Sequence, residues 1–332
     1  MARVILTVLI LAAVLGTAYV YWNYQVETQY DNGRLVSVRI TRRPDGARPG
    51  LPWESANLPS ARPLQPTFRM ASFDVERLDE RKLANRRISD VLLRVVPKFE
   101  LIAIQGFQGP NRGEALRLVE AVNQSSGRQY DFAAPPVGSQ SEYMAFIFDQ
   151  TAIEVDRSTV HAVNDPAGVF RCPPLVAQFR VRGPTPNEAF TFQAISVRVD
   201  PERLDEQLAL LDDVYRAVRD DGRNEDDIIL LGALETDEHH LGQLGQVPEL
   251  APVVSMMPTT VRGTRRADNI LLRRRATSEF TGRAEVFDLM RECDLTIEQA
   301  LEVSEHLPVW AEFSSFEGGR PGVLAAQPGS PQ

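Results

Sequence analysis

The sequence predicts an α/β protein, and two observations lead to this class. Between residues 67 and 313, short apolar segments alternate with segments whose apolar residues recur every three or four positions. Such alternation is typical of sheets covered by helices. The chain also has 332 residues, 43% of them hydrophobic and 24% charged, which is ordinary globular composition. That length allows one large domain or two small ones, and a domain of about 250 residues needs no disulfide or metal for stability.

The alternating segments define the expected elements in order. An apolar strand at 68–73 opens the domain, and helical spacing of apolar residues follows at 82–96. Further strands are expected where apolar runs are short, and further helices where the spacing is three or four. The remaining strands are expected at 101–104, 144–148, 175–181, 190–197, 228–231, 269–272 and 309–313, and the remaining helices at 115–123 and 204–219.

The first 22 residues form a candidate membrane anchor. Residues 4–22 read VILTVLILAAVLGTAYVYW and hold no charge, and a helix of this length spans about 30 Å of hydrocarbon. A cleaved signal peptide is the alternative, with Gly16 and Ala18 near a cleavage point. The length of the run and its aromatic end favour an uncleaved transmembrane helix. Arginines lie on both sides of the apolar run and do not agree on its orientation in the membrane. We expect the soluble part to lie outside the cytoplasm.

The segments that flank the expected domain at 67–316 have a different composition. Residues 23–66 contain several prolines and glycines and are expected to form a linker, with a short strand at 35–40. The tail at 317–332 is rich in glycine and proline and is expected to be disordered. The sequence therefore predicts one folded domain between an anchored linker and a tail.

Charge and cysteine content limit the classes of partner and site. The formal net charge is −9, which argues against non-specific binding of nucleic acid but leaves room for a local arginine patch. Cys172 and Cys293 lie far apart in the sequence. They fit neither a disulfide framework nor a zinc-binding spacing, so we expect two buried or half-buried thiols.

Seven segments, in this order, carry a resemblance to a known superfamily. They are FRMASFDVERL at 68–78, ELIAIQGF at 100–107, SEYMAFIF at 141–148, FQAISVRVDP at 192–201, DDIILLGALET at 226–236, TTVRGTRRADNILL at 259–272 and SEHLPVWAEF at 304–313. Together they resemble the endonuclease/exonuclease/phosphatase superfamily, and within it the deoxyribonuclease I-like proteins. The resemblance implies two stacked β-sheets flanked by helices, a four-layer α/β sandwich with a site at one edge.

The resemblance also implies hydrolysis of phosphodiesters with Mg²⁺ or Ca²⁺. Such chemistry needs a base for the attacking water, carboxylates for the metal and donors for the phosphate. Asp268 and His306 match the family's Asp–His pair, and Glu142 matches the Glu that supports a second histidine. Arg198 stands at that second position and cannot pass a proton at neutral pH. We expect it to form a salt bridge with Glu142, with anion binding as the alternative.

Three further substitutions weaken the expected site. Gly106 stands where the family's metal-binding Glu follows Gln105, and glycine offers no side-chain oxygen. Ala233 replaces the family's Asp, and Glu235 replaces a neutral Asn that faces phosphate. The charge of Glu235 would repel a phosphate unless a cation lay between them.

Several carboxylates nevertheless remain as candidate metal ligands. Glu76 lies where it could compensate in part for the carboxylate lost at Gly106. Asp74 replaces the family's Asn on the first strand, and Glu305 replaces the family's Asp before His306. These groups could supply enough oxygens for one divalent ion. The candidate ligands are Asp74, Glu76, Glu235 and Glu305.

Two other groups near the expected site have simpler explanations. His239 and His240 follow two acidic residues, and we expect a solvated loop because no partner ligand lies at a fixed spacing. Arg262, Arg265 and Arg266 would suit an anionic ligand, but ordinary solvated charge explains them as well.

The lost groups favour a DNase I-like domain that is catalytically impaired or inactive and acts as a binding or scaffold module at the membrane. Groups that act as a unit lose most of the rate when one of them is removed. The alternative is a divalent-metal-dependent phosphodiesterase or endonuclease with rearranged ligands. A third interpretation is a paralogue without a biochemical role. The sequence allows a nucleic acid or another phosphoester as a ligand, and it identifies no protein partner.

Overall fold

The computed structural model describes residues 24–31, 34–42, 66–136 and 142–319. They belong to two units, within residues 1–56 and 57–332. The first unit contains an antiparallel hairpin of β1 (Tyr24–Asp31) and β2 (Arg34–Arg42). The strand predicted at 35–40 is therefore present and longer than predicted, and its partner strand was missed in the expected linker.

The predicted membrane helix at 4–22 and residues 320–332 of the tail predicted at 317–332 lie outside the described residues. The first three residues of that tail, Glu317–Gly319, form a 3₁₀ turn. Within the described ranges, none of the helices has the length and apolar character needed to cross a membrane.

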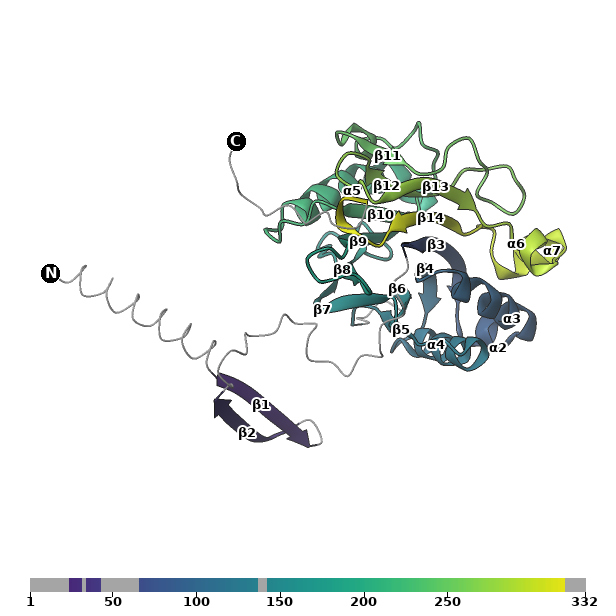
Figure 1. Cartoon of the computed structure of the whole chain (residues 1–332). Helices are drawn as coiled ribbons and strands as arrows, with labels where there is room; N and C mark the ends of the chain where they lie inside the picture. Colours follow the sequence, from purple (N-terminus) through teal and green to yellow (C-terminus); the bar gives the residue numbers. More distant parts are fainter. Residues whose placement is uncertain (1–23, 32–33, 43–65, 137–141, 320–332) are drawn as a thin grey trace. The chain divides into compact units, whose positions relative to one another are not determined.

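The second unit is built on two six-stranded mixed sheets (Figure 1). The first sheet has the order β13-β14-β3-β4-β6-β5 and the second β11-β12-β10-β9-β8-β7. The first comprises β3 (Thr67–Leu78), β4 (Leu101–Gln108), β5 (Tyr130–Ala133), β6 (Glu142–Asp149), β13 (Phe280–Val286) and β14 (Val309–Ser314). The second comprises β7 (Ile153–Ala162), β8 (Leu175–Val181), β9 (Thr191–Arg198), β10 (Ile228–Ala233), β11 (Leu250–Pro252) and β12 (Asp268–Arg273).

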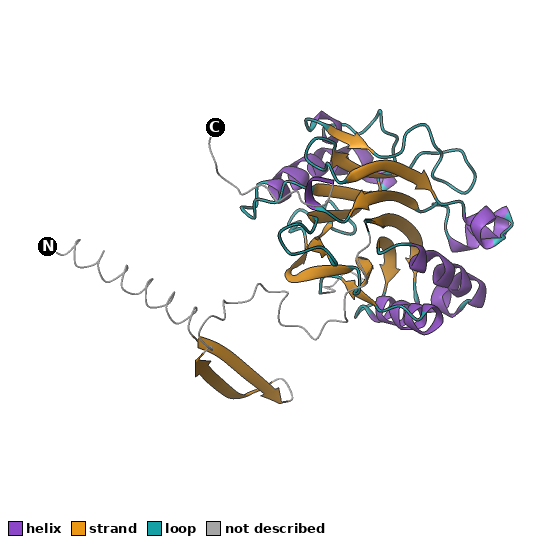
Figure 2. Cartoon of the chain, in the orientation of Figure 1, coloured by secondary structure: helices purple, strands orange, loops and turns teal. Residues whose placement is uncertain are grey.

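Helices cover the outer faces of both sheets (Figure 2). Apolar residues of α3, α4, α6 and α7 pack with one face of β3, β4 and β6 in a single buried cluster. The apolar stripe of α5 packs on β9 and β10. The four-layer arrangement implied by the resemblance is therefore confirmed. The helices are α2 (Glu80–Ala84), α3 (Arg86–Val95), α4 (Gly113–Ser126), α5 (Leu204–Arg219), α6 (Leu289–Cys293) and α7 (Ile297–Val303).

The helix predicted at 82–96 differs from the structure because it is interrupted. Asn85 has an extended backbone, ends α2 and accepts a hydrogen bond from the backbone N–H of Arg87 at the start of α3. Asparagine is a favoured N-cap residue, since its side-chain oxygen satisfies an N–H that lacks a partner within the helix. The apolar periodicity continues through both helices and hides the break.

The core between the sheets is rich in aromatic rings. Phe68 stacks on Phe192 and Phe313, with ring centroids 6.0 and 5.7 Å apart, and Phe179 stacks on Phe192 at 5.5 Å. Because successive strand residues point to opposite faces, the same strands contribute to this core and to the helix-covered clusters. This packing fixes the two sheets against each other. The expected thiols are confirmed, because Cys172 and Cys293 are both free and buried.

Candidate active site

The expected site residues lie where strands of the two sheets end together. β3 pairs with β4, and β9 with β10, as parallel strands, so the carboxyl ends of each pair lie at one edge. Between the sheets, the buried Gln105 amide donates to Ser72 Oγ at 3.0 Å and to Ser196 Oγ at 2.9 Å. These hydrogen bonds hold the two sheets in register next to the site. They were missed from the sequence, although a polar residue inside an apolar strand run signals such a contact.

His306 lies between two carboxylates. Its Nδ1 is 2.9 Å from Asp268 Oδ2, and its Nε2 is 3.4 Å from Glu235 Oε1. Thr259 Oγ1 donates to the same Asp268 oxygen at 2.9 Å and fixes the carboxylate. Burial lowers the pKa of His306, but the negative charge and hydrogen bond of Asp268 outweigh it and raise the pKa to about 10. This shift favours the protonated imidazole, whose two nitrogens face the carboxylates of Asp268 and Glu235.

Arg198 joins two carboxylates from different strands. Its Nε donates to Asp74 Oδ2 at 2.7 Å and its Nη1 to Glu142 Oε1 at 2.8 Å. The predicted salt bridge to Glu142 is therefore present, and Asp74 adds a second one. Arg171 Nε lies 3.2 Å from the other oxygen of Glu142. Burial works against the charge of Arg198, but Asp74 and Glu142 outweigh it and raise its pKa above the ordinary arginine value. The guanidinium is a permanent cation here.

Gly106 adopts a backbone conformation that favours glycine, with φ of +85°. A Cβ at this position would lie 2.9 Å from the backbone nitrogen of Glu76 and 3.0 Å from Asp74 Oδ1. Glu76 also has a left-handed backbone, with φ of +49°, and its Oε2 accepts a hydrogen bond from Glu305 N at 2.8 Å. The space beside Gly106 is thus filled by the backbone of β3, and the Glu76 carboxylate anchors the loop before β14.

The segment after β10 brings more charge to the site. Ala233 ends the strand and is buried, whereas the Glu235 carboxylate forms an ion pair with Arg265. Arg266 pairs with Asp237 at 2.9 Å and with Glu238 at 2.7 Å. Two of the arginines considered for anion binding therefore neutralise acidic neighbours.

The neighbouring histidines and Arg262 lie at the surface. His239 and His240 are exposed, and His240 Nδ1 lies 2.7 Å from Asp237 Oδ1. Arg262 is exposed as well. This agrees with the solvated loop expected from the sequence.

The carboxylates of the site do not form a cage of three protein ligands for a divalent ion. In the described part of the chain, no three of these site residues bring their ligand atoms within 4.8 Å of one another. Oxygens bound to one Mg²⁺ at about 2.1 Å lie no more than about 4.2 Å apart. Asp74, Glu142 and Glu235 each bind an arginine, while the Glu305 side chain is exposed.

A pocket of about 260 Å³ borders this site. Its walls include Glu142, Arg171, Cys172 and Arg198 from the site region, and Asp200, Pro201 and Glu202 complete it. Three acidic side chains and two arginines line it, so its charges largely compensate one another. Arg171 was missed from the sequence because the loop before Cys172 has no recognisable pattern. Burial raises the pKa of the Cys172 thiol to about 12, so the cysteine is not a reactive thiolate.

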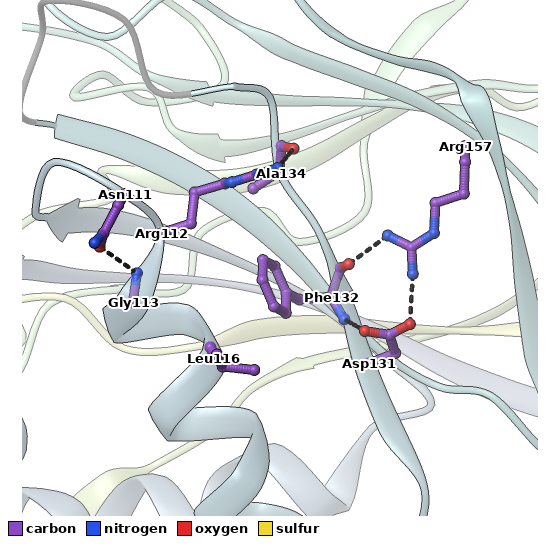
Figure 3. A pocket seen from close by; sticks show the side chains of 8 residues that line it. All are labelled: Asn111, Arg112, Gly113, Leu116, Asp131, Phe132, Ala134 and Arg157. Carbon is purple, nitrogen blue, oxygen red and sulfur yellow. Dashed lines mark hydrogen bonds and ion pairs between the residues drawn. The ribbon is translucent and has the colours of Figure 1, made fainter. Parts of the chain in front are cut away.

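A second pocket, of about 420 Å³, contains none of the predicted site residues (Figure 3). It lies between the start of α4 and β5, where Arg157 donates to Phe132 O and pairs with Asp131, both at 2.5 Å. Arg112 donates to Ala134 O at 3.2 Å. These arginines are engaged with the protein itself.

The comparisons with known proteins agree with the fold and with the resemblance. No protein-family model matches the chain. Deoxyribonuclease-1-like 1 of Homo sapiens is 24% identical over 258 residues, which cover 74% of this chain and 84% of the relative. Deoxyribonuclease gamma of Homo sapiens is 26% identical over 277 residues, which cover 75% of this chain and 86% of the relative.

Two solved structures share the fold at low sequence identity. D. rerio TDP2 complexed with single strand DNA product superposes with a TM-score of 0.54 and 13% identity, over 75% of this chain and 99% of that chain. An endonuclease/exonuclease/phosphatase family protein from Bacteroides thetaiotaomicron gives a TM-score of 0.50 and 12% identity, over 75% of this chain and 98% of that chain. In sequence the chain is thus similar to the deoxyribonuclease I-like proteins, and in fold it matches the endonuclease/exonuclease/phosphatase superfamily.

Proposed function

We propose that the chain is a membrane-anchored DNase I-like domain without hydrolysis of the family type, and that it serves as a binding or scaffold module. The observation that carries this proposal is the guanidinium of Arg198, bound to both Asp74 and Glu142. The resemblance implies a proton-transferring histidine at this position. A permanently charged arginine cannot accept a proton from water or return one to a leaving group.

The second support is the charge around His306. Its high pKa keeps the imidazole protonated at neutral pH, so this group is not a general base. The Glu235 carboxylate lies beside Nε2 of His306, the nitrogen that could otherwise donate a hydrogen bond to a phosphate. A phosphate that approached His306 would meet this carboxylate first, and the repulsion would weaken binding unless Glu235 moved aside.

A metal would normally supply Lewis-acid assistance in this superfamily. The residues at the expected position do not converge on an ion. Gly106 has no side chain, and the neighbouring carboxylates of Asp74 and Glu235 already pair with arginines. A phosphodiesterase with rearranged ligands, using Mg²⁺ or Ca²⁺, is the competing function. It requires Asp74 and Glu235 to leave their arginines.

The names of the relatives make DNA the first ligand to test for a binding role. One solved neighbour was complexed with a single-strand DNA product. Against DNA stand the net charge of −9 and the pairing of Arg265 and Arg266 with acidic residues. A protein partner is the binding class that these charges allow best.

The enzymatic part of the proposal is tested with the purified full chain. Plasmid DNA and bis-p-nitrophenyl phosphate are incubated with Mg²⁺, Mn²⁺ or Ca²⁺, and wild type is compared with His306→Ala and with the control His239→Ala in the exposed loop. We expect the three proteins to show the same background rate. Metal-dependent turnover that His306→Ala abolishes and His239→Ala retains would overturn the proposal.

The location is tested by cell fractionation. We expect the full chain in the membrane fraction and a chain lacking residues 1–22 in the soluble fraction, because residues 4–22 are apolar and uncharged. A protease added outside intact cells should degrade the domain if it lies outside the cytoplasm. Recovery of the full chain from the soluble fraction would contradict the anchor.

A further inference from the structure

A second cluster of carboxylates lies at the end of β10 opposite the candidate active site. Asp227 immediately precedes β10, whose other end is Ala233 beside Arg198 and Asp268. Glu279 immediately precedes β13, and Glu317 begins the short 3₁₀ turn Glu317–Gly319 after β14. Because the start of β13 pairs with the end of β14, the cluster joins the second sheet to one end of the β13–β14 edge of the first.

Asp227 and Glu279 are buried, Glu317 is half-buried, and the three carboxylates lie close together. Asp227 and Glu279 are each 1% exposed. One ligand oxygen from each of Asp227, Glu279 and Glu317 lies within 4.8 Å of the other two, and the same holds for Glu225, Asp226 and Asp227. Two oxygens bound to one Ca²⁺ at about 2.4 Å can lie no more than about 4.8 Å apart. The spacing thus fits a shared cation.

Several polar atoms in the cluster lack a hydrogen-bond partner. In the described part of the chain these buried atoms are Asp227 Oδ1, Glu279 Oε2, Glu317 Oε2 and the hydroxyl of Thr277. Thr277 is 1% exposed, and its hydroxyl lies close enough to Asp227 to favour the charged carboxylate without a well-formed hydrogen bond. The cluster therefore contains a neutral hydroxyl and three carboxylate oxygens that are buried without a hydrogen-bond partner, which is costly in the absence of a ligand.

Among the described residues, neither Asp227 nor Glu279 nor Glu317 forms a direct ion pair. Burial, followed by the charges of Glu279 and Glu225, raises the pKa of Asp227 to about 10. Burial and the same kind of repulsion raise the pKa of Glu317 to about 7. A cation bound between these carboxylates would offset their mutual repulsion.

We propose that Asp227, Glu279 and Glu317, with the Thr277 hydroxyl, bind a Ca²⁺ ion that fastens the two sheets together at this end. Oxygen ligands alone select a hard cation. Ca²⁺ accepts six to eight oxygens in irregular geometry, and Glu225 is at hand to add another. Mg²⁺ demands a near-ideal octahedron and retains several waters, which suits a buried cluster of carboxylates poorly.

The site is structural, because it lies away from Arg198 and His306 and joins three segments that are distant in sequence. Bound Ca²⁺ would stabilise only the folded state, since the unfolded chain does not bring residues 227, 279 and 317 together. The inference is independent of whether the candidate active site hydrolyses anything.

The test compares thermal unfolding of the full chain at pH 8 in EDTA and in Ca²⁺, for wild type, Glu279→Gln and the control Glu235→Gln at the opposite end of the sheets. At about a hundred times the dissociation constant, Ca²⁺ should raise the wild-type Tm by about 5–10 °C. Glu235→Gln should keep this shift and Glu279→Gln should lose it. In EDTA, Glu279→Gln should melt no lower than wild type, because it removes one of the repelling charges.

Titration calorimetry on wild type supplies a measurement that does not depend on the variants folding. We expect one Ca²⁺ per chain, with release of protons that grows as the pH is lowered towards 7. Thr277→Val, which removes only the hydroxyl, should weaken binding about tenfold. The absence of bound Ca²⁺, a Ca²⁺ shift that Glu279→Gln retains, or a Mg²⁺ shift of equal size would overturn the proposal.

Discussion

Arg198 shows how one residue changes the chemistry of its neighbours while leaving the strand that carries it intact. It lies at the end of β9, is half-buried, and binds one carboxylate from β3 and one from β6. A salt bridge to Glu142 could be predicted because both positions match one motif pair. The contact with Asp74 could not, because it depends on how the two sheets stack.

The first prediction concerns the energetic role of this guanidinium. Arg198→Met leaves Asp74 and Glu142 buried without their shared cation, and such a loss costs about 3 kcal/mol of unfolding free energy. Arg87→Met is the matched control, because Arg87 forms a 2.8 Å pair with Glu302 at the exposed surface, where pairs contribute about 0–1 kcal/mol. Urea unfolding measures both. Equal losses of unfolding free energy in the two variants would show that the buried ion pairs stabilise the protein no more than the exposed pair does.

The second prediction concerns the proton on His306. Its folded pKa of about 10 lies above the ordinary value of 6.5, so its stabilising contribution is fully present below pH 6.5 and is lost as the pH rises through 10. Imidazole ¹⁵N shifts, assigned with His306→Ala, should show a protonated ring from pH 6 to 8. Asp268→Asn should lower the pKa into or below that range. A wild-type titration near 6.5 would contradict the account.

The irregular end of β3 controls the geometry beside β4. The pairing of β3 and β4 shifts register between Asp74 and Leu78, and the irregular stretch brings Glu76 against Gly106. A glutamate introduced at 106 would therefore meet both backbone strain and a filled space. The site cannot be repaired by that single substitution.

The third prediction compares Gly106 with a second glycine that also has a positive φ but no close neighbour. Gly106→Ala should destabilise the protein by about 2–3 kcal/mol, since it combines a left-handed backbone with a 2.9 Å approach to Glu76 N. Gly127→Ala is the control, because Gly127 also has a positive φ but nothing within 4 Å of the added methyl. It should cost only about 1 kcal/mol. Thermal unfolding compares the two, and a Gly106→Ala variant as stable as Gly127→Ala would contradict the close contact.

Element prediction from the sequence succeeded where apolar runs were strong. The strands at 101–104, 175–181 and 228–231 and the helix at 204–219 lie within β4, β8, β10 and α5. β13 was missed because most of its residues are exposed and its sequence, FTGRAEV, has no alternating apolar pattern. α6 and α7 are too short, at five and seven residues, for a helical period to stand out. The dipeptide Asn32-Gly33 between β1 and β2 is a hairpin signal in the sequence.

At the scale of the whole second unit, the two ends of the sheets hold different kinds of charge. At the candidate active site, arginines and a protonated histidine neutralise the carboxylates. At the opposite end, Asp227 and Glu279 lie buried with no such partner among the described residues. The fold and the retained motif positions could be predicted from the sequence. The acidic cluster could not, because its members come from three distant segments without a shared motif.

We propose that Arg198 and Arg265 take the place of a metal at the candidate active site. Crystals of the full chain soaked in Mn²⁺ and examined by anomalous scattering test it most directly, because Mn²⁺ is visible and replaces Mg²⁺. We expect no anomalous peak among Asp74, Glu142 and Glu235, with Arg198 still bound to its two carboxylates. A Mn²⁺ ion coordinated by Asp74 and Glu235, with a bound water facing His306, would contradict it.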